Sequence, residues 1–154
     1  MQATPQPHQQ MVEEVFRKIG RNILLFQNVE LLLKAVLPFM SPTADCTAPV
    51  NEAEMSQVLT ANRSLGTLRD PLRKALQVEN IAGFGDYLNA VRHHRNELVH
   101  LFMLRTDSRL ATVEECLSAI RYLDEQYRFS APLLDLAKEL NQGLIAKLAS
   151  ADPE

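Results

Sequence analysis

Apolar residues recur at intervals of three and four along most of the chain, and this spacing constrains the fold more than any other feature. It is the spacing of side chains on one face of an α-helix. No stretch of the sequence shows the apolar–polar alternation that is typical of a half-buried strand. We therefore expect an all-α protein, an antiparallel helical bundle of about four main helices with additional short helices.

The first expected helix is long, from about residue 9 to residue 37, and Pro38 should end it. Its apolar stripe contains one acidic residue, Glu30, at the same angle around the helix as Val12. A carboxylate on an apolar face needs a partner, so Glu30 is a residue of interest. The other members of the expected stripe are Phe16, Ile19, Ile23, Phe26, Leu33 and Leu37.

Two short helices should follow a proline-rich loop over residues 38–50. Asn51 with Glu54 resembles a capping box, and the helix that it begins should run to about residue 62. Asp70–Pro71 resembles an N-cap followed by a proline at the first helical position, so the second short helix should run from there to about residue 78.

The remaining two helices are expected to be long. A central helix should run from about residue 84 to residue 104, after a turn at Gly83 and Gly85. Thr112 with Glu115 resembles another capping box and begins the last helix. Pro132 lies inside that helix, which predicts a kink or a break near residues 129–131.

Length and composition predict one domain over residues 9–148, with a disordered tail at residues 1–8 and a C-terminal tail at residues 149–154. The net charge of −3 is opposite to that of a nonspecific nucleic-acid-binding protein. No apolar run reaches the roughly 18 residues that cross a bilayer, and the first residues do not form a signal peptide. We therefore expect a cytoplasmic protein outside the membrane. Cys46 and Cys116 are far apart and predict neither a disulfide framework nor a zinc site.

Residues 92–100 form the densest ionisable cluster and hold three of the four histidines. Four residues share one polar edge of the expected helix, namely His93, Asn96, Glu97 and His100. Arg95 lies instead on the apolar stripe, where a guanidinium is retained only if a carboxylate, a phosphate or a partner chain holds it. Glu30 is the internal candidate, and the two would then form a buried structural ion pair.

Arg95 and His100 are about 140° apart around an ideal α-helix. They can act on one phosphate through the reach of the arginine, or as a composite site in a homodimer. Asn96 can hydrogen-bond the His100 ring and fix its orientation. These groups suit cleavage of RNA, because histidine can move the 2′-OH or 5′-oxygen proton and arginine can stabilise the developing charge. The 2′-OH is the nucleophile, so the reaction needs no metal and no cofactor.

The run Arg95-Asn96-Glu97-Leu98-Val99-His100 resembles the signature of the HEPN domains (higher eukaryotes and prokaryotes nucleotide-binding), which is Arg, four to six residues, then His, often with a polar residue after the arginine. The first helix, with residues 27–34 near its end, is similar to the opening helix of small bacterial members. The resemblance implies a homodimer with both motifs at the interface. It also implies metal-independent endoribonuclease activity on RNA, in a toxin–antitoxin or phage-defence setting with an antitoxin protein as a further partner. The candidate catalytic residues are Arg95, Asn96 and His100, with Glu30, His93 and Glu97 in support.

Two other interpretations stay open. His93, Glu97 and His100 are spaced to share a helix face, as the ligands of bundle metal sites are, but the sequence offers no second Glu-x-x-His to complete such a site. The second is a non-catalytic HEPN-like module for dimerisation and interaction, in which Arg95 and His100 only form hydrogen bonds at an interface.

Overall fold

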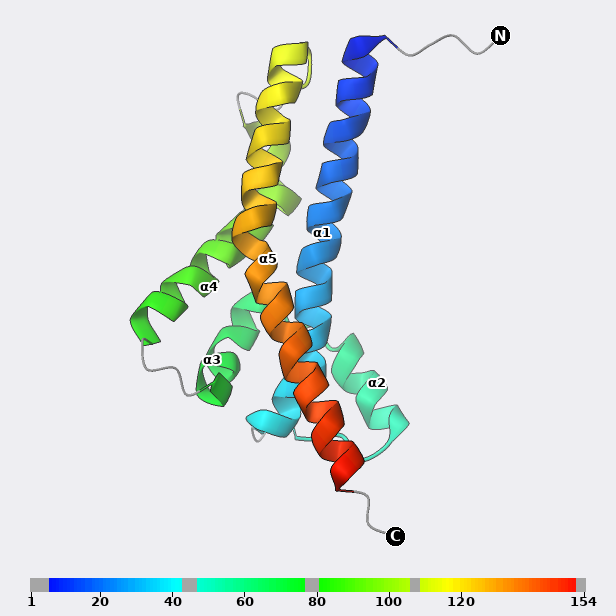
Figure 1. Cartoon of the computed structure of the whole chain (residues 1–154), viewed down its shortest axis with the longest axis vertical. Coiled ribbons are helices and arrows are strands. Elements are labelled where there is room, and N and C mark those ends of the chain that lie inside the picture. The colour runs from blue at the N-terminus through cyan, green and yellow to red at the C-terminus, as the bar shows by residue number, and fades with distance from the viewer. Residues whose placement is uncertain (1–5, 43–46, 77–80, 106–108, 152–154) are drawn as a thin grey trace, which may run out of the picture.

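The computed structural model describes residues 6–42, 47–76, 81–105 and 109–151, which form an all-α bundle (Figure 1). The expected fold class is therefore confirmed. The elements in chain order are α1 (Pro7–Met40), α2 (Glu52–Thr60), α3 (Leu65–Leu76), α4 (Ile81–Asn96), the π-helix η1 (Glu97–Leu101), the 3₁₀-helix η2 (Phe102–Leu104) and α5 (Val113–Ser150).

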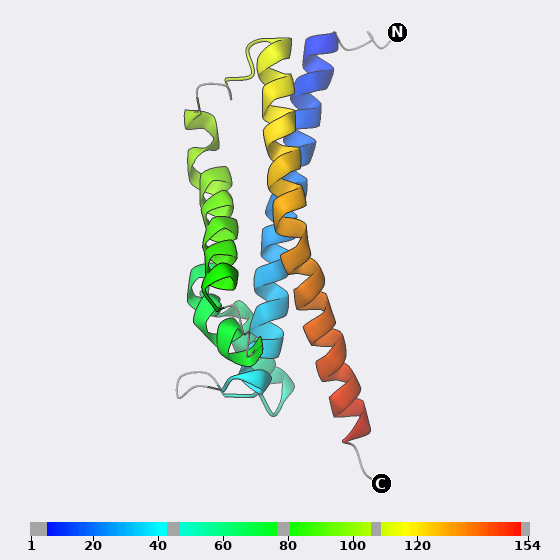
Figure 2. The ribbon, with the colours of Figure 1, turned by 60° about the vertical axis from the view of Figure 1, so that its left-hand side comes forward.

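The two longest helices, α1 and α5, lie side by side and run in the same direction (Figures 1 and 2). His8 near the start of α1 contacts the Leu110 carbonyl just before α5, at 2.9 Å, and Asn141 in the second half of α5 donates to the Leu32 carbonyl at 2.9 Å. Helix α4 runs in the opposite direction to both. The expectation that all main helices are antiparallel neighbours is therefore wrong for α1 and α5. Helix α4 leads the chain back to the end of the bundle where α1 begins, so α5 starts beside the start of α1.

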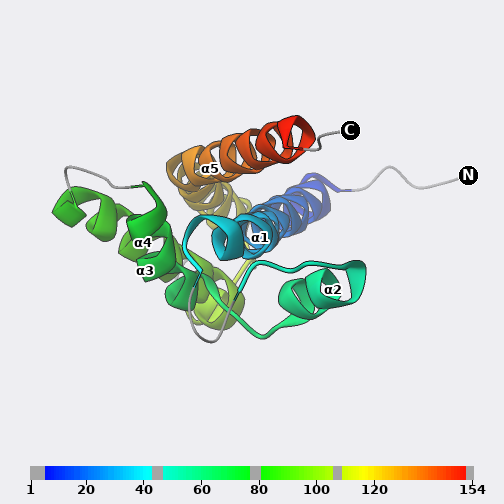
Figure 3. The ribbon, with the colours of Figure 1, turned by 90° about the horizontal axis from the view of Figure 1, so that it is seen from below.

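The hydrophobic core is built mainly between α1 and α5, and α3 and α4 close it on one side (Figures 1 and 3). Phe16, expected on the buried stripe of α1, is 58% exposed, and the neighbouring Val15 is fully buried instead. The buried stripe is therefore rotated relative to the expected one. The fully buried residues of the core include Val29, Leu33 and Val36 of α1, Leu68 and Leu72 of α3, Val91 of α4, and Leu123, Leu133 and Ala137 of α5.

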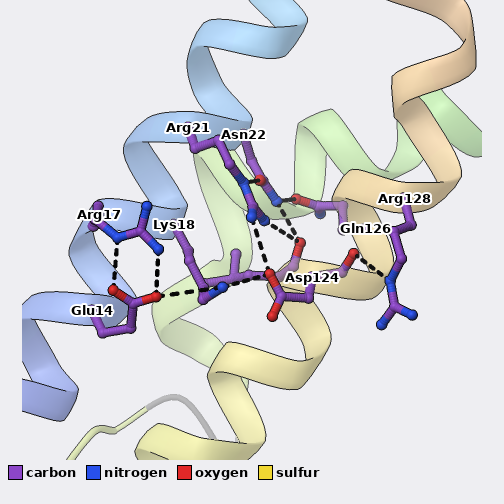
Figure 4. Close-up of polar contacts among 9 residues, drawn as sticks. Glu14, Arg17, Lys18, Arg21, Asn22, Asp124, Gln126 and Arg128 are labelled. Atoms are coloured by element: carbon purple, nitrogen blue, oxygen red, sulfur yellow. Dashed lines mark hydrogen bonds and ion pairs between the residues drawn. The ribbon is translucent and has the colours of Figure 1, made fainter.

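A buried polar contact crosses the α1–α5 interface (Figure 4). The Asn22 side-chain amide, only 1% exposed, donates to the Leu123 carbonyl at 2.8 Å and to Gln126 Oε1 at 2.9 Å. Gln126 is itself 2% exposed. Buried amides of this kind are costly unless they are paired, so this contact fixes the register of the two helices.

Charged residues extend the same contact toward solvent (Figure 4). Lys18 Nζ lies 2.7 Å from Asp124 Oδ1, and Arg21 Nη1 lies 3.0 Å from the same oxygen. These two cations, with Lys18 contributing most, lower the pKa of Asp124. On the surface of α1, the Arg17 guanidinium lowers the pKa of Glu14 to about 2.

Both predicted capping boxes are present. The Asn51 side chain accepts from Glu54 N at 2.9 Å, and the Thr112 hydroxyl accepts from Glu115 N at 3.1 Å. Each side chain pairs an amide that has no partner inside its helix.

The predictions made from proline were less accurate. Pro38 lies within the last turn of α1, which continues to Met40. Pro71 lies well inside α3, which begins at Leu65, so the start predicted at Asp70–Pro71 is wrong. The amide of Leu65 donates to the Glu30 carboxylate at 3.1 Å. A contact with α1 therefore sets the start of this helix, and short-range sequence signals do not reveal it.

The two long C-terminal elements also differ from expectation. Helix α4 begins at Ile81, so Gly83 and Gly85 lie inside a helix and not in a turn, and the α-helical hydrogen bonding ends at Asn96. Helix α5 continues through Pro132 and bends in its middle part, so of the two predicted outcomes the break is absent and a kink is observed (Figures 1 and 2).

The predicted tails are partly helical. Residues 7 and 8 belong to α1, and α5 extends to Ser150. Residues 1–5, 43–46, 77–80, 106–108 and 152–154 lie outside the described residues, and with them Cys46 and the end of the second short helix predicted near residue 78. Cys116 is buried near the start of α5.

Among the described helices, α1 is long and apolar enough to cross a membrane. The core helices of soluble proteins can have the same length and composition.

Replacing Asn22 with alanine should destabilise the fold. The Leu123 carbonyl and Gln126 Oε1 would each lose a buried hydrogen-bond donor, at a cost of about 1–3 kcal/mol. Urea unfolding should show this loss, whereas Asn28→Ala on the exposed face of α1 should change stability by less than about 0.5 kcal/mol. Equal stabilities for the two variants would contradict the role given to Asn22.

Candidate functional site

The Arg95–His100 run lies where the hydrogen bonding of the helix changes. Arg95 and Asn96 end α4, and the next five residues form η1 with π-type geometry. In a π-helix the hydrogen bonds join residues five apart, so such residues come closer to one line than in an α-helix. The 140° separation expected between Arg95 and His100 on an ideal α-helix therefore does not apply. Single π-turns inside helices occur frequently at functional sites.

The predicted pairing of Arg95 with Glu30 is confirmed, in a loose form. Arg95 Nε lies 3.7 Å from Glu30 Oε1, and the two side chains are 28% and 16% exposed. The pair is therefore partly buried, and its separation is longer than that of a hydrogen bond. Glu30 Oε1 also accepts from Leu65 N, so one carboxylate contacts both α3 and α4.

Two cavities open on either side of this ion pair. The smaller, of about 160 Å³, lies at the start of α3 and brings Arg92 next to Arg95. The larger, of about 270 Å³, lies between α1 and η1 and has a mainly apolar wall. The smaller cavity is lined by Glu30, Ser64, Leu65, Gly66, Arg92, Arg95 and Asn96, and the larger by Ile23, Phe26, Gln27, Glu30, Arg95, Leu98 and Val99. Arg95 and Glu30 are common to both, so the guanidinium lies between two hollows.

Asn96 does not orient His100 as predicted. Its side-chain oxygen accepts from Arg95 Nη1 at 3.3 Å, and no hydrogen bond joins it to His100 in the parts of the chain that the structure describes. The imidazole of His100 is exposed and lines neither cavity. Within one chain, the structure therefore brings together Glu30, Arg95 and Asn96, and leaves His100 outside this group.

Glu97 is held by residues of α5 that the sequence analysis missed. The Tyr122 hydroxyl donates to Glu97 Oε2 at 2.9 Å, and the Gln126 amide lies 3.3 Å from the same hydroxyl. Burial and the neighbouring Glu97 carboxylate raise the pKa of Tyr122 to about 12. The Arg105 guanidinium lies over the Tyr122 ring, 3.7 Å from its centre. The start of η1 is thus fastened to the same polar residues that join α1 to α5.

Only the structure reveals Asn22 and Gln126 as polar residues at core positions of long helices. Asn22 lies about 80° around the helix from Glu30 and outside the expected apolar stripe, so the anomaly that identified Glu30 did not reveal it. The contact from Tyr122 to Glu97 could not be inferred this way either, because the exposed edge of α5 carries many polar side chains.

His93 is largely exposed, with Nε2 3.7 Å from Glu97 Oε2. The metal-site interpretation would need His93, Glu97 and His100 to gather with further ligands. Among the described residues, no three histidine, cysteine, aspartate or glutamate side chains are placed to hold a metal ion.

His94 is another residue that the sequence analysis did not single out. Its ring lies edge-on to Phe129, with ring centres 5.0 Å apart, and its Nδ1 is buried without a hydrogen-bond partner among the described residues. Burial is the main cause that lowers the pKa of His94; Glu97 opposes this effect and His93 adds to it. The backbone carbonyl of His94 accepts from Gln126 at 2.9 Å.

The chain was compared with models of protein families, with curated proteins and with solved structures, and no match was found. The fold and site together define a small all-α bundle with a partly buried arginine–glutamate pair between two cavities. The resemblance to HEPN domains remains a prediction from the Arg95–His100 run.

Two substitutions of Glu30 should separate its two contacts. Glu30→Gln keeps an acceptor for Leu65 N and removes the charge opposite Arg95, so it should cost at most about 1 kcal/mol. Glu30→Ala removes both and should cost roughly 2 kcal/mol. Chemical unfolding of both variants measures the difference, and unchanged stability in both would rule out a structural role for this carboxylate.

His94 should make stability depend on pH. Since the folded pKa of His94 lies below the ordinary 6.5, the unfolded chain binds more protons in the window between the two values. The free energy of unfolding should fall as the pH drops below about 6.5 and level off below the folded pKa. His94→Leu should lose part of this dependence in urea unfolding between pH 7.5 and pH 5, whereas the exposed His93→Gln should keep it. Identical pH profiles for wild type and His94→Leu would contradict this assignment.

Proposed function

We propose that the protein is a metal-independent endoribonuclease whose site combines Arg95 and Asn96 of one chain with His100 of a second copy. The observation that carries the proposal is the position of Arg95. Its guanidinium is partly buried between two cavities and only loosely paired to Glu30, with Arg92 beside it. Arginine in such a position suits a phosphate, which it can bind through two parallel hydrogen bonds.

The reaction needs a proton acceptor, a proton donor and stabilisation of charge at phosphorus. The 2′-oxygen attacks the phosphorus, the P–O5′ bond breaks, and the products are a 2′,3′-cyclic phosphate and a 5′-hydroxyl. His100 takes the 2′-OH proton or gives a proton to the leaving oxygen, while Arg95 stabilises the charge on the phosphoryl oxygens. DNA lacks the attacking hydroxyl and should not be cut.

A homodimer is part of this proposal because His100 lines neither of the cavities that hold Arg95. His100 lies in η1 between the exposed apolar residues Val99 and Leu101, which are both 46% exposed. If the second copy buried its own Val99 and Leu101 against the first chain, the His100 imidazole of the second copy would also move toward the cavities of the first chain. Glu97, held by Tyr122, and His93 beside it would position this turn.

The second candidate is a non-catalytic HEPN-like dimerisation and interaction module. Exposed apolar side chains favour it, since Met103 and Leu104 beyond the motif are 63% and 78% exposed. A covering protein, such as the antitoxin that the family resemblance implies, would bury them. The toxin–antitoxin or phage-defence setting is likewise a prediction from that resemblance.

RNA cleavage tests the first candidate. The purified full chain should cut tRNA or mixed cellular RNA in the presence of EDTA and leave 2′,3′-cyclic or 3′-phosphate ends. His100→Ala and Arg95→Ala should each lower the cleavage rate by about 100-fold or more. Arg121→Ala changes an exposed arginine on α5, away from the motif, and should leave the rate unchanged.

Undiminished cleavage by His100→Ala or Arg95→Ala would assign the activity to a contaminant or to another site. If no cleavage is observed although the protein is dimeric, the interaction module is the better description.

A further inference from the structure

The middle part of α1 carries an exposed stripe that the rest of the described chain leaves uncovered. Its apolar members Phe16, Leu24 and Leu31 are 58%, 59% and 47% exposed. Gly20 and Gln27 lie between them, and all five fall within about 80° of one another around the helix. Above the level of α2, Figure 1 shows no described element beside α1 on the side away from α5. These five residues are called the α1 stripe below.

The α1 stripe has the symmetry of a face that pairs with itself. Phe16 and Leu31 lie equally far from the midpoint between Ile23 and Leu24, as do Gly20 and Gln27. An antiparallel copy would therefore set Phe16 against Leu31 and Gly20 against Gln27, with the two Leu24 side chains near the axis. A Cβ atom placed at Gly20 would meet nothing within 4 Å, so the surface above Gly20 is open to the partner's Gln27. We infer that two copies of this chain associate through antiparallel packing of their α1 stripes.

Charges at the ends of the stripe favour a second copy over an unrelated apolar partner. Glu13 and Lys34 flank the stripe and are also equally far from its midpoint. Antiparallel pairing sets Glu13 of each copy opposite Lys34 of the other, which gives two opposite-charge pairs. Parallel pairing in register would instead set like charges together at both ends. The charge pattern therefore selects one direction of packing.

This packing would also complete the larger cavity. Ile23 and Gln27 of α1 line that cavity together with Arg95, and Gln27 belongs to the stripe. The partner's α1 would pass along the cavity mouth near its own Gly20. The inference rests on the proposed function only for the statement that the dimer brings Arg95 near the second copy. The packing of α1 is independent of any RNA chemistry.

Sedimentation of the full chain over a range of concentrations, without RNA, tests the packing. Leu24→Lys would place two lysines near the axis and should raise the dimer dissociation constant at least about tenfold. Leu148→Lys, at a residue 51% exposed near the end of α5, should not change it. Glu13→Lys and Lys34→Glu should each raise the dissociation constant by up to about fivefold.

The double charge reversal, Glu13→Lys with Lys34→Glu, decides the direction of packing. It should restore the wild-type dissociation constant to within about twofold. The two residues are about 30 Å apart along one helix, so this rescue can arise only between chains.

Three results would overturn the inference. They are a monomer at all concentrations, a dimer that Leu24→Lys leaves intact, or a double variant as weak as the singles. If the protein cuts RNA as a dimer whose dissociation constant does not respond to the Leu24, Glu13 and Lys34 substitutions, the nuclease proposal stands and this interface is rejected. A wild-type protein that forms the α1 dimer, weakened by Leu24→Lys, but cuts no RNA would keep this interface and reject the nuclease.

Discussion

The buried amide contact between Asn22 and Gln126 is the interaction on which the rest of the bundle depends. It aligns α1 and α5 in parallel, and their shared interface contains most of the core. Gln126 uses its donor nitrogen on the His94 carbonyl and lies within hydrogen-bond distance of the Tyr122 hydroxyl. The polar residues that fix the register of the two long helices therefore also fix the position of α4 along α5. A purely apolar interface would allow α1 and α5 to slide, because hydrophobic contact is not directional.

The change from α-helix to π-helix after Asn96 follows from these attachments. A π-turn is rare and occurs mostly as a single turn inside an α-helix, so the contacts around this one are of interest. Here α5 donates to the His94 carbonyl and to Glu97, on both sides of the point where the hydrogen bonding changes. The altered turn moves His100 relative to Arg95, so the long helix α5 shapes a motif that it does not contain.

The features that could be predicted from the sequence are those decided by nearby residues. Thr112 and Glu115 lie within one turn of each other, and the cap that they form needs no other part of the chain. The start of α3 was predicted wrongly because a carboxylate from α1 determines it. The exposure of Phe16 was missed for a related reason: periodicity shows that a helix has apolar side chains but not which of them another element covers. The all-α class and the Glu30–Arg95 pair could be predicted; the parallel packing of α1 and α5 could not.

Glu30 places a limit on what the smaller cavity can bind. Its carboxylate balances Arg95 and accepts from the first amide of α3, so it already occupies the place where an anion would be stabilised by a helix N-terminus. An incoming phosphate would meet this negative charge as well as the guanidinium groups of Arg92 and Arg95. With one carboxylate against two guanidinium groups, the local balance still favours an anion. Because Arg95 Nε is 3.7 Å from Glu30, the arginine can turn toward a phosphate without breaking a close hydrogen bond to the carboxylate. Glu30 would then keep the start of α3 in place while Arg95 changes partner, which reconciles a structural ion pair with a binding role for the same arginine.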